Sequence, residues 1–280
     1  MSDRVINTNG AAIRVEESGA GEPALIFLHY WGGSSRTWRI VIDRLGDKSR
    51  CIALDQRGWG ASIATDARYD LSVMADDVEA VARQLGLGRY VLVGHSMGGK
   101  VAQIVAARRP KELVGLVLIA PAPPTPMPVP EAVRAGMLQS YGSRAGVLQA
   151  LAVLGGESLS SELREQVIEN TLPGAPEAKR TWTERGMIQD VTAGLDAVRL
   201  PVTVVVGDRD QVEHEAALRD TFARFLPQTS FRVLQGVGIF LRWKHRMPWL
   251  TPVKICFTRF ERMIVATSRP LSGTLPPSDQ

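Results

Sequence analysis

The strongest indication of a catalytic site in the sequence is the segment around Ser96. Residues 93–99 read VGHSMGG, a G-x-S-x-G pattern that lies between an apolar strand pattern and a helix pattern. A sharp strand-to-helix turn strains the serine backbone and leaves room only for small residues two positions to either side. The pattern predicts that Ser96 is a nucleophile, and that the amide of Met97 faces the negative charge developing on an attacked carbonyl oxygen.

Two further motifs accompany this turn. Residues 29–34 read HYWGGS at the end of an apolar strand pattern, and residues 55–62 read DQRGWGAS. Together with the serine turn they resemble the α/β-hydrolase family, in particular its small bacterial esterases, lactonases and cofactor-free haloperoxidases. The similarity runs from about residue 11 to residue 238. It implies a mostly parallel sheet flanked by helices, with a helical cap inserted after the sixth strand.

The resemblance also assigns roles in the first motif. The backbone amide of Trp31 corresponds to the family's second donor to the oxyanion, and Tyr30 stands where the family usually has glycine. We expect His29 to brace this loop and not to act as a base, and we expect the side chain of His95 to point away from Ser96. The 55–62 motif is expected to position a loop, without a chemical role.

The acid is expected after the strand pattern at residues 201–206. There the chain continues Gly207-Asp208-Arg209-Asp210, and the family's G-x-x-D pattern points to Asp210. Such an acid holds a histidine in the correct tautomer and stabilises its charged form. Asp208 is the alternative, and we expect it to cap the turn instead.

The base is missing where the family has it. After residues 235–238 (QGVG) the family pattern continues with histidine, and this chain has Ile239. A neutral serine hydroxyl without a general base is a poor nucleophile. His245 and His214 are the alternatives, and either would require a departure from the family geometry.

A change of reading frame accounts for this absence. Codons can be chosen for residues 238–248 (GIFLRWKHRMP) such that one C inserted after the codon of Gly238 yields the peptide GHFSPLEAPDA, which restores the family's histidine and the loop after it. We therefore infer a one-base deletion at codon 239. Residues 239–280 carry seven Lys/Arg and two Asp/Glu and show no helical apolar stripe, in keeping with this inference. A divergent C-terminus with its own role is the alternative.

Alternating strand and helix patterns must position these residues. Strands are predicted at 11–17, 24–29, 51–54, 90–93, 113–120, 201–206 and 230–234, and helices at 71–85 and 97–109. Residues 121–130 contain six prolines and can form neither a helix nor a central strand. Helical patterns then fill the chain to about residue 199. The sequence predicts a hydrolase core at 1–122 and 200–280 and a cap at 123–199.

Composition narrows the class of protein. The net charge of +4 resides in residues 239–280, so the nearly neutral remainder is not that of a dedicated nucleic-acid binder. No apolar run approaches the roughly 20 residues of a membrane-spanning helix. Two cysteines, with no secretory signal pattern, favour a cytoplasmic protein. The expected chemistry requires no metal and no organic cofactor.

The expected substrate is a small carboxylic ester or lactone, attacked by Ser96 with Asp210 as the acid. Perhydrolysis of the haloperoxidase type and hydrolysis of a carbon–carbon bond are alternatives on the same residues. A third alternative, from another class, is a binding module that holds a ligand without turnover. The sequence does not determine the substrate or the oligomeric state.

Overall fold

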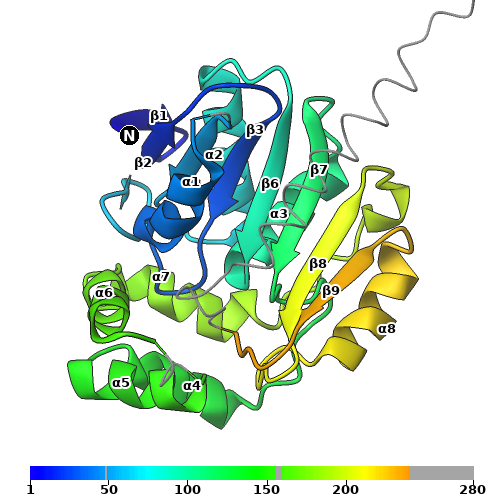
Figure 1. Ribbon diagram of the computed structural model, residues 1–280. Coiled ribbons are helices and arrows are strands. Elements are labelled where there is room, and N and C mark those ends of the chain that lie inside the picture. The colour runs from blue at the N-terminus through cyan, green and yellow to red at the C-terminus, as the bar shows by residue number, and fades with distance from the viewer. Residues whose placement is uncertain (48, 156–158, 240–280) are drawn as a thin grey trace, which may run out of the picture.

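The computed structural model describes residues 1–47, 49–155 and 159–239, and its centre is one mostly parallel sheet (Figure 1). The strand order is β1-β2-β4-β3-β6-β7-β8-β9, and β5 pairs with β2 at one side. β2 runs antiparallel to β1 and β4, and every pairing from β4 to β9 is parallel. The strands are β1 (Ser2–Thr8), β2 (Ala11–Ser18), β3 (Ala24–Leu28), β4 (Cys51–Leu54), β5 (Ile63–Ala64), β6 (Tyr90–His95), β7 (Leu113–Ile119), β8 (Val202–Gly207) and β9 (Ser230–Leu234).

The predicted strands are confirmed, with ends that differ by one or two residues. β3, β4, β6 and β8 are buried at every position, as continuous apolar runs in a parallel sheet should be. β1 and β5 were not predicted from the sequence. β1 is an edge strand of mostly exposed, polar residues, and β5 has only two residues, so neither has an apolar pattern.

Helices cover both faces of the sheet. α1 (Arg39–Leu45) packs on one face with Trp38. α2 (Leu71–Gln84), α3 (Met97–Arg108) and α8 (Glu215–Phe225) contribute to the larger apolar cluster on the other face. These faces use alternate residues of the same strands: Leu25 and Phe27 join the first cluster, whereas Ile26 and Leu28 join the second.

Between β7 and β8 the chain leaves the sheet and forms a group of helices beyond one end of it (Figure 1). We call this group the cap. It contains α4 (Glu131–Ser140), α5 (Arg144–Val153), α6 (Ser161–Thr171), α7 (Pro176–Thr181), the short π-helix η3 (Trp182–Gly186) and the turn η4 (Leu195–Ala197). The described residues of this stretch contain no strand, and the proline-rich segment before α4 is irregular, as predicted. β7 is the sixth strand if the two-residue β5 is left out.

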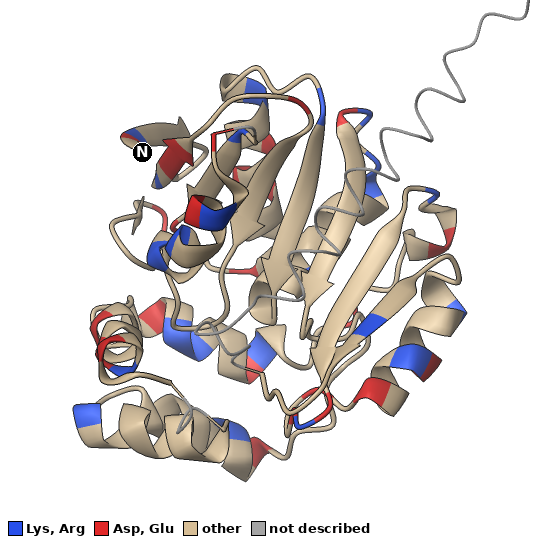
Figure 2. Cartoon of the chain, viewed as in Figure 1, with Lys and Arg blue, Asp and Glu red and all other residues tan. Residues whose placement is uncertain are grey.

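Charged residues of both signs are interspersed along the helices in the view of Figure 2. In the described part of the chain, no helix is long and apolar enough to cross a membrane. His245, and the basic residues that give the chain its net charge, lie outside the described residues.

Candidate active site

Ser96 occupies a strained turn between β6 and α3. Its φ of 50° and ψ of −114° lie where a residue with a side chain is rarely found. The turn is held by the end of β7, because the amide of Ser96 donates to the carbonyl of Ile119 at 3.1 Å and the amide of Ala122 donates to the carbonyl of Ser96 at 3.2 Å. The Ser96 side chain is half-buried at this edge of the sheet.

The small residues around Ser96 are required by the geometry, as predicted. A Cβ atom on Gly94 would lie 2.5 Å from the carbonyl oxygen of Gly98, and a Cβ atom on Gly98 would lie 2.4 Å from the carbonyl oxygen of Leu28. Both distances are far below a van der Waals contact. The glycines therefore allow the start of α3 to lie against the ends of β3 and β6.

Residues 29–34 form a loop next to this turn, here called the Trp31 loop. Two backbone amides, one in this loop and one at the start of α3, have no hydrogen-bond acceptor in the described chain. The amide of Gly33 donates to the carbonyl of Tyr30 at 2.9 Å, so Trp31 and Gly32 form the tip of a tight turn. Met97 is the first residue of α3, where an amide has no acceptor within its helix. Among the described residues, neither the amide of Trp31 nor that of Met97 has a protein acceptor. Both are therefore available to an oxyanion.

His29 braces this loop from the core side. The backbone amide of Gln56 donates to its Nε2 at 3.0 Å, so the proton of the neutral ring is on Nδ1. Nδ1 then donates to the carbonyl of Tyr30 at 2.7 Å. Because that carbonyl belongs to the same peptide plane as the amide of Trp31, His29 fixes the direction of the amide. Burial lowers the pKa of His29 to about 4, so the ring is neutral near pH 7 and braces the loop as predicted.

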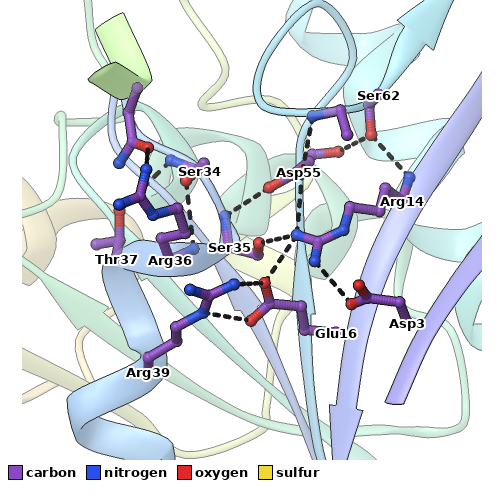
Figure 3. A network of polar contacts seen from close by, with 12 residues as sticks. Asp3, Arg14, Glu16, Ser34, Ser35, Arg36, Thr37, Arg39, Asp55 and Ser62 are labelled. Atoms are coloured by element: carbon purple, nitrogen blue, oxygen red, sulfur yellow. Dashed lines mark hydrogen bonds and ion pairs between the residues drawn. The ribbon is translucent and has the colours of Figure 1, made fainter. Parts of the chain in front are cut away.

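The 55–62 motif holds the other end of the same loop (Figure 3). Asp55 follows β4 directly, and its two carboxylate oxygens accept from the amides of Ser35 at 2.6 Å and Ala61 at 2.9 Å. Arg14 lies beside it and pairs at 2.8 Å with Glu16, which is buried. The motif thus connects the Trp31 loop to the sheet by hydrogen bonds, in agreement with the positioning role expected from the sequence.

Asp210 lies at the end of β8 and is 3% exposed. Its Oδ1 accepts from the amides of Val212 at 2.8 Å and Glu213 at 2.9 Å. Oδ2 is buried and has no partner in the described part of the chain. Burial raises the pKa of Asp210, against the effect of these two hydrogen bonds. An unpaired carboxylate oxygen in such a position requires an explanation, and a hydrogen-bond donor from another segment would supply it.

Asp208, the alternative acid, has a different environment. It is exposed, and its Oδ1 accepts from the amides of Gly236 at 2.6 Å and Val237 at 3.2 Å. Asp208 is thus a capping residue, as expected, but the turn that it caps is the one after β9 and not its own.

Position 239 lies between the nucleophile turn and the acid turn. The segment before it is anchored to the Asp210 turn, because the amide of Arg209 donates to the carbonyl of Val237 at 2.9 Å. Ile239 itself is buried, and its backbone hydrogen-bonds the ring of His95, the residue next to Ser96. A side chain at this position is thus close to both turns, and in this chain it is an aliphatic one.

The other two described histidines are His95 and His214. His95 packs edge-on against Tyr30 with ring centroids 5.1 Å apart, and burial lowers its pKa to about 3, so it is a weak proton acceptor. His214 is the exposed residue that precedes α8, and its electrostatic interaction with the buried Asp210 lowers the pKa of that carboxyl group. His245 lies outside the described residues.

Two buried charged groups near these turns were not found from the sequence. Lys100, four residues after Ser96 on α3, is fully buried and its Nζ donates to the carbonyls of Thr125 and Met187, both at 3.3 Å. Burial lowers the pKa of Lys100 to about 8 and raises that of the buried Glu213 well above its usual value. The signal available was a lysine within an apolar helix, but the sequence does not identify its partners.

The sequence profile of the α/β-hydrolase fold matches residues 23–169, more than half of the chain, so the protein belongs to the α/β-hydrolase family. It is 28% identical to the 2-(acetamidomethylene)succinate hydrolase of Mesorhizobium japonicum, over 83% of this chain and 87% of that protein. It is 27% identical to a non-heme haloperoxidase of Rhodococcus erythropolis, over 84% and 91%. It is 30% identical to the pimeloyl-[acyl-carrier protein] methyl ester esterase of Yersinia pseudotuberculosis, over 79% and 87%.

Among solved structures, an E-2-(acetamidomethylene)succinate hydrolase superposes on the chain with a TM-score of 0.75 and 25% identity. That comparison covers 93% of this chain and 99% of the other. These relatives are named as hydrolases, an esterase and a haloperoxidase, in keeping with an α/β-hydrolase enzyme.

Proposed function

We propose that this chain carries the site of a serine hydrolase for a carboxylic ester or lactone, with its general base absent. The observation that carries the proposal is the backbone of Ser96, which is held at a φ of 50° between two glycines that admit no side chain. Strain of this kind persists only where the surrounding structure enforces it, and it presents the hydroxyl at the sheet edge.

The reaction follows from the geometry. With a base at position 239, Ser96 Oγ attacks the carbonyl carbon as its proton passes to that base, and the amides of Trp31 and Met97, which have no acceptor in the described chain, receive the developing oxyanion. The ester C–O bond then breaks as the base returns the proton to the leaving alkoxide, and water hydrolyses the acyl group from Ser96. The buried Oδ2 of Asp210 is the group that would orient an imidazole and stabilise its cation. An esterase among the relatives supports the substrate class.

The missing member of this arrangement is the base at position 239. We attribute its absence to a one-base deletion at codon 239, so the chain is a hydrolase with strongly reduced activity. The gene sequence tests this origin directly. An intact frame, in a source-strain homologue identical to this chain, would exclude the deletion.

Hydrolysis of a short-chain p-nitrophenyl ester tests the function. We compare this chain, its Ile239→His variant, the frame-restored protein, and each of these with Ser96→Ala. The frame-restored protein should turn over at least about 100-fold faster than this chain, because a positioned base contributes about 10² to 10⁴ in rate. Ser96→Ala should abolish the gain, and Ile239→Leu is the control for the substitution. A frame-restored protein without Ser96-dependent turnover contradicts the proposal.

Perhydrolysis is a second candidate on the same residues, since one relative is a haloperoxidase. Assay of the frame-restored protein with acetate, peroxide and a halide acceptor separates it from ester hydrolysis. A rate of halogenation above the rate of ester hydrolysis would favour perhydrolysis.

The third candidate, a module that binds a ligand without turnover, is favoured for this chain by the absent base. It predicts that this chain retains an ester ligand unchanged, and release of product by this chain excludes it.

A further inference from the structure

The cap contacts the Trp31 loop directly. Tyr141, which follows α4, stacks on the indole of Trp31 with ring centroids 3.7 Å apart and an interplanar angle of 10°. Its hydroxyl donates to the carbonyl oxygen of Trp31 at 3.3 Å. A residue 110 positions away in the sequence thus covers the tip of the loop and holds one of its carbonyls.

A second cap residue holds the next carbonyl. Thr171, the last residue of α6, is fully buried, and its hydroxyl donates to the carbonyl oxygen of Gly32 at 3.1 Å. A Cβ atom on Gly32 would lie 2.7 Å from the ring of Tyr141 and 2.9 Å from the hydroxyl of Thr171. The loop and the cap are therefore packed too closely at position 32 for any residue other than glycine.

One buried ammonium group joins the two cap helices that make these contacts. Nζ of Lys179, on α7, donates to the carbonyls of Tyr141 at 3.1 Å and Leu172 at 2.9 Å. These carbonyls end α4 and α6, where the partial negative charge of a helix collects. Among the described residues, no carboxylate has an electrostatic effect on the pKa of Lys179, which burial alone lowers, so the two carbonyls are the polar partners of its Nζ.

We propose that Lys179 is a positioning residue for the oxyanion donor Trp31. Lys179 fixes the ends of α4 and α6, and the side chains at those ends hold the carbonyls of Trp31 and Gly32. His29 fixes the same turn from the core side, so the amide of Trp31 is held between the core and the cap. The catalytic role of this amide rests on the proposed function. The contacts from Lys179 through the two helix ends to the Trp31 loop, here called the mechanical link, do not depend on it.

Hydrogen exchange tests the mechanical link in the chain as it is. In Lys179→Met, the peptide that covers residues 29–36 should exchange about tenfold faster than in the parent, the effect of about one lost hydrogen bond. Peptides from β6 should not change. The control is Lys111→Met, since Lys111 has a side chain that is 91% exposed. Faster exchange confined to the cap, with residues 29–36 unchanged, would show that Lys179 stabilises only the cap and would overturn the inference.

The frame-restored protein tests the consequence for catalysis. There Lys179→Met should lower kcat about tenfold while KM changes less than twofold, because a displaced donor acts mainly on the transition state. Tyr141→Phe keeps the stacked ring and loses one hydrogen bond, so its effect should be about threefold, and Lys179→Arg should recover part of kcat. A rise in KM with kcat unchanged contradicts the inference. If the frame-restored protein has no turnover at all, the proposed function fails, and the exchange experiment still decides the mechanical link.

Discussion

The turns after β4 and β8 each contain a buried aspartate, and the two aspartates differ in how many of their carboxylate oxygens accept hydrogen bonds. Asp55, after β4, has partners on both oxygens: the amides of Ser35 and Ala61. Asp210, after β8, has partners on Oδ1 alone, while its buried Oδ2 has none in the described chain. A carboxylate that serves the fold is satisfied within its own surroundings. In the proposed function, Asp210 keeps Oδ2 for a group supplied by another segment, and this unpaired oxygen lowers the stability of the fold.

The largest expected effect is the pH dependence of stability that His29 causes at the Asp55 turn. Burial lowers the pKa of His29, which braces the Asp55 side, to about 4 from an ordinary value of 6.5. Between pH 6.5 and about 4, His29 binds a proton in the unfolded chain but remains neutral in the folded chain. The contribution of His29 to the free energy of unfolding is therefore fully present above pH 6.5 and is lost as the pH falls to about 4. The loss should total about 3 kcal/mol. Urea unfolding of the parent and of His29→Asn, between pH 7 and 4, should show a steeper fall for the parent. Parallel profiles would contradict this prediction.

A second test removes charge from the satisfied carboxylate. Asp55→Asn should lower the free energy of unfolding by about 2 kcal/mol, because an amide nitrogen replaces one of two oxygens that accept from backbone amides. Urea denaturation at pH 7 measures this. The matched variant is Asp210→Asn. An equal loss of unfolding free energy in both variants would contradict the proposed difference between the two turns.

The smallest expected effect is an increase in stability. Asp210→Asn should raise the free energy of unfolding by about 1 kcal/mol at pH 7, because Oδ1 can still accept from Val212 and Glu213 while a buried charge is removed. Since the pKa of Asp210 is raised, the folded parent binds a proton as the pH falls, and the gain should shrink toward low pH. Asp208→Ala, which removes the cap of Gly236 and Val237, should instead lose about 1 kcal/mol by the same measurement.

Local patterns allowed most of the core to be predicted. The buried strands and the glycine pattern of the Ser96 turn could be predicted from neighbouring residues, whereas Asp208 caps a turn 28 residues further along the chain. The brace formed by His29 was also expected, although its partner Gln56 was not. The strands and the Ser96 turn were predictable because chain geometry over a few residues determines them.

The contacts between segments could not be predicted. No periodicity indicates that Tyr141 stacks on Trp31 or that Lys179 joins two helix ends. The same holds for Lys100, whose partners lie at the two ends of the cap segment. β1 was missed because an exposed edge strand needs no apolar alternation when it pairs with β2 along its whole length.

The contact of Tyr141 and Thr171 with the Trp31 loop limits how cap segments can be exchanged between relatives. A cap transplanted for a new substrate would also replace the donors to the carbonyls of Trp31 and Gly32. A chimaera would therefore change its rate along with its substrate preference, unless the incoming helices carry equivalents of these two residues and of Lys179.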